Sequence, residues 1–343
     1  MTRHLYTAKE PFPFEAGGSL DHLQIVYHCS DRPYAGPSDP RKVIWVCHAL
    51  TANSDPEDWW PEMAGPGKLF DTEKFFVVCC NMIGSSYGSS GPATTDPVTG
   101  KPYFFDFPAT TVRDLVRSQN LVREDLGIPK IDLLIGASIG GFQAVEWLLM
   151  YPDVVRNAVL LATLARITPW LTAFEESQRM ALEADQTFRA CQDLTGGREG
   201  LKCARSIALL SYRNGDGYNR KQQEPDDDTL FACRSASYQR YQGQKLADRF
   251  DAYSYWYLSN TLDSHNAGRG RGGLKAALGR VRCRPTVIAI DSDLIFPPGD
   301  MQEMARAIPG ARYHEITSHY GHDGFLLETD QLTALLKPII NEL

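Results

Sequence analysis

The chain has 343 residues, of which 43% are hydrophobic and 22% charged, so it can bury a large core in one domain with an insertion. A net charge of −7 and the lack of a long basic tract argue against nucleic acid or an anionic membrane as a partner. The N-terminus lacks the apolar run of a signal peptide, no segment approaches membrane-spanning length, and the eight cysteines are scattered, so we expect a cytoplasmic protein.

The first half of the chain alternates strand and helix signals. Residues 41–47 end in an apolar run that predicts a strand. Residues 111–126 predict a helix, because Thr111 and Asp114 form a capping pair and the apolar residues lie largely on one face. Residues 131–135 are again apolar and predict a buried strand.

The most informative motif is the G-x-S-x-G sequence within residues 136–141. It stands between the strand at 131–135 and an apolar helix at 142–150, which is the context of a nucleophile elbow. The glycines permit the tight turn, and the first N–H groups of the helix suit a developing oxyanion. A glycine-rich turn with an incidental serine is the alternative. We predict that Ser138 is a nucleophile in an α/β-hydrolase fold, with a mostly parallel sheet and helices on both faces.

A nucleophilic serine needs a base and a carboxylate that orients the base, and in this fold both follow the serine along the chain. Residues 285–290 predict a strand, and Asp293 lies in the loop after it. A short strand at 311–316 is followed by a loop with His322 and then by a last helix at 325–343. We therefore predict Asp293 as the acid and His322 as the base.

Both positions have rivals nearby. Asp291 lies nearer to its strand end than Asp293 and would more readily bond backbone as a turn residue. His319 could replace His322, although the glycine before His322 gives the sharper loop. His314, His319 and His322 also suggest a metal site, but no acidic or cysteine ligand recurs at zinc spacing around them, so we predict no metal.

The loop after the strand at 41–47 should supply a second oxyanion donor, the first being the residue after the nucleophile. This nominates the backbone N–H groups of Leu50 and Ile139. For His48 in the same loop, hydrogen bonding to nearby backbone is at least as well supported as a catalytic role.

At these motifs the chain resembles the homoserine O-acetyltransferase family, a branch of the α/β-hydrolases. The shared blocks cover nearly the whole chain and are His48–Thr51, Asn81–Pro92, Thr99–Tyr103, Asp106–Pro108, Gly136–Gly141, Asp291–Asp293 with Phe296–Pro297, and Gly321–Leu326. The resemblance implies transfer of an acetyl group from acetyl-CoA to L-homoserine through a Ser138 acyl-enzyme, in methionine biosynthesis. It also implies no bound cofactor, and a homodimer formed through the lid region.

The resemblance further assigns residues to the acceptor amino acid. Arg205 looks like the arginine that grips the substrate carboxylate, Tyr212 follows it, and Asp323 looks like the partner of the substrate ammonium. From the residues alone, a solvated helix arginine and a cap of the final helix are the simpler interpretations. Ala137 and Ile139 depart from the glycine and methionine usual beside the family's serine, which bears on the choice of donor and acceptor.

The pattern breaks near residue 166. Residues 1–165 and 274–343 are predicted to form the core, and 166–273 an inserted helical lid that holds Arg205 and Tyr212. The glycine- and arginine-rich segment 266–273 lacks the strand and the Lys-Ser/Thr of a phosphate-binding loop. We interpret it as a mobile linker between lid and core, with contact to the coenzyme A phosphates as the alternative.

Three alternatives to this function stay open. The chain could be a serine hydrolase of the same fold that uses water as the acceptor, or an acyltransferase that uses serine or a succinyl donor. A non-catalytic binding module is the third, but such proteins usually lose a triad member, whereas Ser138, Asp293 and His322 are all present.

Overall fold

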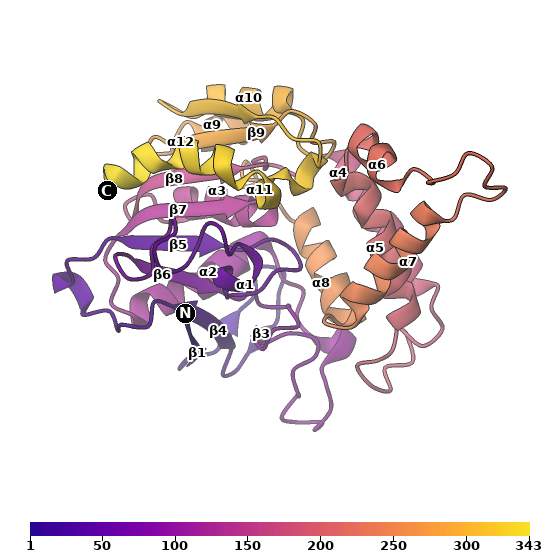
Figure 1. The fold of residues 1–343 in the computed structure, drawn as a ribbon. Helices are drawn as coiled ribbons and strands as arrows, with labels where there is room; N and C mark the ends of the chain where they lie inside the picture. Colours follow the sequence, from indigo (N-terminus) through magenta and orange to yellow (C-terminus); the bar gives the residue numbers. More distant parts are fainter.

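In the computed structural model, which describes residues 1–343, eight strands form one sheet with helices on both faces (Figure 1). Their order across the sheet is β1-β4-β6-β5-β7-β8-β9-β10, with the pairs β1–β4 and β4–β6 antiparallel and all later pairs parallel. The strands are β1 (Thr2–Thr7), β4 (Gln24–Cys29), β5 (Val43–Cys47), β6 (Phe76–Cys80), β7 (Ile131–Ala137), β8 (Val155–Leu161), β9 (Thr286–Ile290) and β10 (Arg312–Ile316), and a separate hairpin pairs β2 (Phe12–Pro13) with β3 (Ser19–Leu20). The predicted α/β-hydrolase architecture is confirmed.

The central strands are apolar throughout because both faces of the sheet are covered. Along β5, Trp45 packs into the cluster shared with α2 and α3, whereas Ile44 and Val46 pack into the cluster shared with α12. The helices of this core are α1 (Pro56–Trp59), α2 (Val112–Asp125), α3 (Ile139–Met150), α9 (Leu274–Leu278), α10 (Pro298–Ala307), α11 (Gly324–Leu327) and α12 (Thr329–Asn341).

The ends of two helices test the local predictions. The capping box of α2 is confirmed: Thr111 Oγ1 accepts from the Asp114 N–H, and Asp114 Oδ2 accepts from the Thr111 N–H at 3.0 Å. The single last helix predicted at 325–343 is wrong. The backbone leaves the helical region at Glu328, with ψ of +48°, and divides the segment into α11 and α12.

The lid predicted at residues 166–273 contains five helices that stand together beside the sheet (Figure 1). They are α4 (Pro169–Glu183), α5 (Arg198–Tyr212), α6 (Gly215–Gln222), α7 (Arg234–Ala247) and α8 (Ala252–Asp263). The chain enters and leaves this unit side by side, because Ile167 N–H donates to His265 O and Ala267 N–H donates to Ala165 O, both at 2.9 Å. No helix of the protein has the length and apolar character to cross a membrane.

Residues 266–273 connect α8 of the lid to α9 of the core, and two ion pairs attach them to the core. Arg269 forms an ion pair with Glu15 at 2.8 Å, and Arg271 forms one with the buried Glu146 at 2.6 Å. These pairs tie the segment to the core and engage both of its guanidinium groups. The alternative interpretation, a contact with coenzyme A phosphates, therefore loses its two cations.

Candidate active site

Ser138 occupies the sharp turn between β7 and α3. Its φ of +58° and ψ of −126° lie outside the regions that residues with a side chain normally adopt. The Ser138 N–H donates to Leu161 O and Ala162 O at 3.1 Å, which holds this conformation against β8. The side chain does not cap α3, so the hydroxyl is left for the adjoining cavity.

The glycines around Ser138 are required by neighbouring backbone. A Cβ at Gly136 would overlap the carbonyl of Gly140, and a Cβ at Gly140 would overlap the carbonyl of Cys47 at the end of β5. A Cβ at Gly141 would overlap the Thr163 side chain. The turn is therefore clamped between the ends of β5 and β8, which brings Ser138 to the edge where the parallel strands end.

His322 and Asp293 form the hydrogen bond that the sequence predicted. His322 Nδ1 lies 2.7 Å from Asp293 Oδ2, and both side chains are buried. The other oxygen of Asp293 accepts from the N–H groups of Ile295 and Phe296 at 2.8 and 3.0 Å. The carboxylate of Asp293 can only accept a hydrogen bond, so Nδ1 of His322 carries the proton and donates it. Nε2 is then unprotonated and free to act as a base.

The rival residues take other partners. Asp291 Oδ1 accepts from the Ser318 N–H at 2.9 Å, which is the backbone role considered for it. His319 Nδ1 lies 3.3 Å from the Arg220 guanidinium, outside the cavity that Ser138 lines. His314 is on β10. No three His, Cys, Asp or Glu side chains gather as a metal ion would require.

The surroundings of His322 favour its protonated form. Burial lowers the pKa of His322, but the charge and hydrogen bond of Asp293, with a further contribution from the charge of Asp323, raise it above its ordinary value. The rings of Phe296 and Phe325 lie 5.3 Å from the imidazole centroid, and that of Tyr212 lies at 5.8 Å. The aromatic rings thus hold the imidazole in place, and the two carboxylates stabilise its protonated form.

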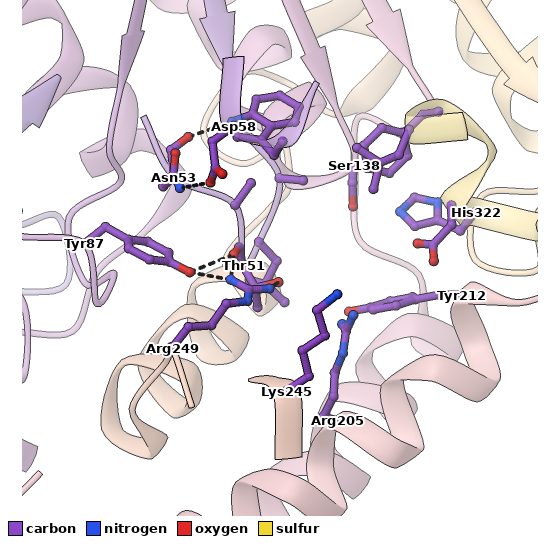
Figure 2. Close-up of a pocket in the computed structure, with 17 residues that line it drawn as sticks. Thr51, Asn53, Asp58, Tyr87, Ser138, Arg205, Tyr212, Lys245, Arg249 and His322 are labelled. Carbon is purple, nitrogen blue, oxygen red and sulfur yellow. Dashed lines mark hydrogen bonds between the residues drawn. The ribbon is translucent and has the colours of Figure 1, made fainter. Parts of the chain in front are cut away.

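A cavity of about 560 Å³ lies in front of Ser138, between the core and the lid. The core contributes Leu50, Thr51, Tyr87, Ser138, His322 and Asp323, and the lid contributes Arg205, Tyr212, Lys245 and Arg249. In Figure 2, Ser138 and His322 lie on one side, and the long side chains of Arg205, Lys245 and Arg249 extend from the lid on the other. No hydrogen bond joins Ser138 to His322; such contacts often tighten only when substrate binds.

Two backbone N–H groups are available beside Ser138. The Leu50 N–H donates to no acceptor in the protein. Ile139 is the first residue of α3, so its N–H has no acceptor within the helix. Both N–H groups are therefore free to donate, and their role as oxyanion donors stays a prediction.

His48 supports the loop that carries Leu50. Its Nδ1 lies 2.9 Å from Ala49 O, and its Nε2 accepts from the Met82 N–H at 3.0 Å, so Nδ1 carries the proton. Burial lowers the pKa of His48 to about 4, which keeps the ring neutral. The side chain is fully buried and does not line the cavity, in agreement with the backbone-bonding interpretation.

Arg205 and Tyr212, both on α5, line the cavity with Ser138. The Arg205 guanidinium lies 5.5 Å from the centroid of the Tyr212 ring. It forms no ion pair with any carboxylate of the protein. Burial raises the pKa of the Tyr212 hydroxyl far above its usual range, so this group is a neutral hydrogen-bond partner.

Asp323 also lines the cavity, and its side chain does not cap α11. Oδ2 forms an ion pair at 2.9 Å with Arg213, which follows Tyr212 in the chain. Sequence reasoning missed Arg213, although its position next to Tyr212 was a usable signal. Oδ1 has no partner in the protein and is left for another cation.

Sequence reasoning also missed two cations of the lid. Lys245 is in the last turn of α7, Arg249 lies in the turn just after that helix, and both line the cavity. Arg249 donates to Thr51 O at 2.6 Å and to the hydroxyl of Tyr87 (Figure 2). Lys245 has no hydrogen-bond or ion-pair partner.

Comparison with known proteins places these residues in a family context. A family model described as alpha/beta hydrolase fold matches residues 42–329. The homoserine O-acetyltransferase of Cyclobacterium marinum is 40% identical over 337 residues, which cover 98% of this chain and 95% of that protein. The crystal structure of the homoserine O-acetyltransferase from Staphylococcus aureus is 30% identical with a TM-score of 0.81, covering 99% of this chain and 95% of that one. Esterase E22 shares the fold, with a TM-score of 0.88 at 21% identity over 99% of both chains.

Proposed function

The chain belongs to the homoserine O-acetyltransferase family of α/β-hydrolase-fold enzymes, as its motifs predicted, and we propose that its cavity transfers an acetyl group from acetyl-CoA to the hydroxyl of L-homoserine. The observation that carries the proposal is that Ser138, His322 and two groups of opposite charge, Arg205 and Asp323, line one cavity, with Asp293 bonded to His322 behind it.

The first half-reaction loads Ser138. His322 Nε2 removes the proton of the Ser138 hydroxyl while Oγ attacks the thioester carbon of acetyl-CoA. The N–H groups of Leu50 and Ile139 donate to the oxyanion of the tetrahedral intermediate. The carbon–sulfur bond then breaks, and the imidazolium gives its proton to the departing thiolate. Asp293 stabilises this imidazolium through Nδ1.

The second half-reaction repeats these steps with the acceptor. His322 Nε2 removes the proton of the homoserine hydroxyl, whose oxygen attacks the acyl carbon on Ser138. The same two N–H groups hold the new oxyanion. The bond to Ser138 Oγ breaks, His322 returns the proton to Oγ, and O-acetylhomoserine leaves.

A zwitterionic acceptor needs one fixed cation and one fixed anion. Arg205 has no carboxylate partner in the protein, which suits it to the homoserine carboxylate, with Tyr212 beside it. Asp323 would accept from the ammonium through Oδ1, while Arg213 holds Oδ2. We therefore expect Arg205→Ala to slow transfer from acyl-Ser138 to homoserine steeply and to affect the loading of Ser138 little.

The test follows the acyl group on Ser138. Wild-type enzyme incubated with acetyl-CoA should gain one acetyl group by intact-mass spectrometry, and Ser138→Ala should not. The loaded enzyme is then given homoserine, serine or buffer alone. Rapid release only with homoserine supports the proposal; equal release in buffer would identify a hydrolase, and release to serine another transferase. A wild type that is loaded by succinyl-CoA alone would also refute the assignment.

Three further features belong to the proposal. We propose that residues 166–273 act as the lid over a core of 1–165 and 274–343, that the enzyme works in the cytoplasm, and that two copies associate through the lid.

The lid exposes large apolar side chains, including Leu210 at 56%, Leu230 at 84% and Phe231 at 81%, which supports such an interface. Light scattering of the wild type and of Leu230→Ser/Phe231→Ser tests it.

A further inference from the structure

The formally charged side chains that line the catalytic cavity are mostly cationic. They are Asp58, Arg205, Lys245, Arg249 and Asp323. The two acids already have partners in the protein, since Asp58 accepts from an asparagine amide at 2.8 Å and Asp323 is in an ion pair. None of the three cations contacts a carboxylate. Arg213 neutralises the charge of Asp323, so the three cations outnumber the one remaining acid of the lining, Asp58, in a chain of net charge −7.

Lys245 and Arg249 line the same cavity as Arg205 and Asp323, the pair assigned to the acceptor. Arg249 is anchored by uncharged oxygens, the Thr51 carbonyl and the Tyr87 hydroxyl, so its position is fixed while its charge stays available. The Lys245 ammonium, four residues earlier, has no partner. Both residues are exposed; Lys245 is in the last turn of α7, and Arg249 is in the turn between α7 and α8. In Figure 2 both side chains extend from the lid toward the cavity that His322 also lines.

The chemistry of the acyl-CoA donor explains why the cavity has more cationic side chains than the acceptor needs. A single Arg205 already matches the one carboxylate of an amino acid. Coenzyme A instead carries several phosphate charges at the far end of a long neutral arm, so they stay near the mouth when the thioester reaches Ser138. An arginine fork and a lysine point charge are the side chains that bind phosphate. Building on the proposed function, we infer that Lys245 and Arg249 form the subsite for the phosphate groups of the acyl-CoA donor.

The experiment compares two donors that differ in their phosphates. Acetyl-CoA and S-acetyl-N-acetylcysteamine present the same thioester, but only the first carries phosphate. The ratio of their kcat/KM values, measured with saturating homoserine, reports the contribution of the phosphates. We expect Lys245→Met and Arg249→Gln each to lower this ratio about tenfold, equivalent to about 1.4 kcal/mol. Arg249→Lys, which keeps the charge, should restore much of it.

The control is Arg240→Gln, which removes an exposed arginine of α7 that does not line the cavity, and it should keep the wild-type ratio. The inference is overturned if Lys245→Met slows both donors equally, if it changes neither, or if its main effect is on the KM of homoserine. These failures differ from failure of the proposed function, in which wild-type Ser138 is not loaded by acetyl-CoA at all.

Discussion

At the scale of single residues, His48 orients the peptide group between Ala49 and Leu50. The carbonyl of Ala49 and the N–H of Leu50 belong to the same planar unit, so the bond from His48 Nδ1 to that carbonyl also directs the N–H. The Met82 N–H holds the other side of the ring. Ala52 N–H shares the Ala49 carbonyl, so the loop has a second, weaker anchor. We therefore propose that His48 is a positioning residue, which orients the N–H of Leu50, the proposed oxyanion donor, through the backbone.

Two substitutions of His48 separate its two hydrogen bonds. The amide of Asn stands at the distance of Nδ1 from Cα and can still donate to Ala49, whereas the longer Gln reaches only the place of Nε2. We expect His48→Gln to lower the rate of Ser138 loading toward the roughly 10²–10³-fold loss seen on removing an oxyanion donor, and His48→Asn to lower it less. Thermal unfolding of both variants is the control. Equal loading rates with unequal stability would show that His48 only supports the fold.

The pH dependence of the reaction should respond to Asp323. The base must be neutral, so loading of Ser138 falls as pH drops through the pKa of His322, which lies above its ordinary value. The Asp323 charge helps to raise that pKa. Asp323→Asn should therefore move the acidic limb of the single-turnover rate to lower pH, and Arg213→Gln, which frees the Asp323 charge, should move it to higher pH. Limbs that coincide with the wild type in both variants would contradict this coupling.

At the scale of elements, the elbow depends on the close approach of β5, β7 and α3. Gly140→Ala would place a Cβ on the Cys47 carbonyl, and neither backbone can yield without displacing the oxyanion loop. We expect it to destabilise the protein by about 1–3 kcal/mol, as overpacking does, and to lower activity further. Gly299→Ala in the first turn of α10 is the matched control, because its Cβ would meet nothing within 4 Å. Denaturant unfolding that finds the two variants equally stable would refute the clash.

The same scale shows which predictions sequence can supply. The capping box of α2 and the strand–elbow–helix unit were predictable because their residues interact within a few positions. Arg269 and Glu15 are 254 positions apart, so the glycine-rich segment looked unattached until the fold brought them together. Arg213 likewise could not be linked to Asp323, 110 residues later, because their ion pair exists only once the fold brings the end of α5 against the loop that carries Asp323.

At the scale of the whole molecule, the order of three residues along the chain was sufficient to predict that they meet in the core. Ser138, Asp293 and His322 each follow a strand, and parallel strands end at one edge, so their meeting follows from topology. The lid offers no such rule. The positions of Lys245 and Arg249 at the cavity depend on how α5 packs against α7 and α8. No short sequence motif predicts this packing.

Core and lid are joined where His265 is buried, and this should make the molecule sensitive to acid. The ring is 1% exposed, stacks 3.9 Å from Phe142, and donates through Nε2 to Leu164 O, which leaves Nδ1 without a partner. Burial lowers the pKa of His265 to about 3, as it lowers that of His48 to about 4. A depressed histidine pKa means that the unfolded chain binds the proton more readily than the native protein.

Folding stability therefore rises with pH wherever the unfolded state holds more protons. The contribution of the two histidines is complete above about pH 6.5, the ordinary pKa, and is lost as pH falls from there toward 3–4. A depression of this size corresponds to several kcal/mol for each buried ring, on the order of 1.4 kcal/mol per pKa unit. His265→Gln keeps a donor for Leu164 O but cannot titrate. We expect it to be less stable than the wild type at pH 7.5 and to lose less stability between pH 6.5 and 4.5, measured by urea unfolding. Parallel stability–pH curves for the two proteins would show that protonation of His265 does not contribute to acid unfolding.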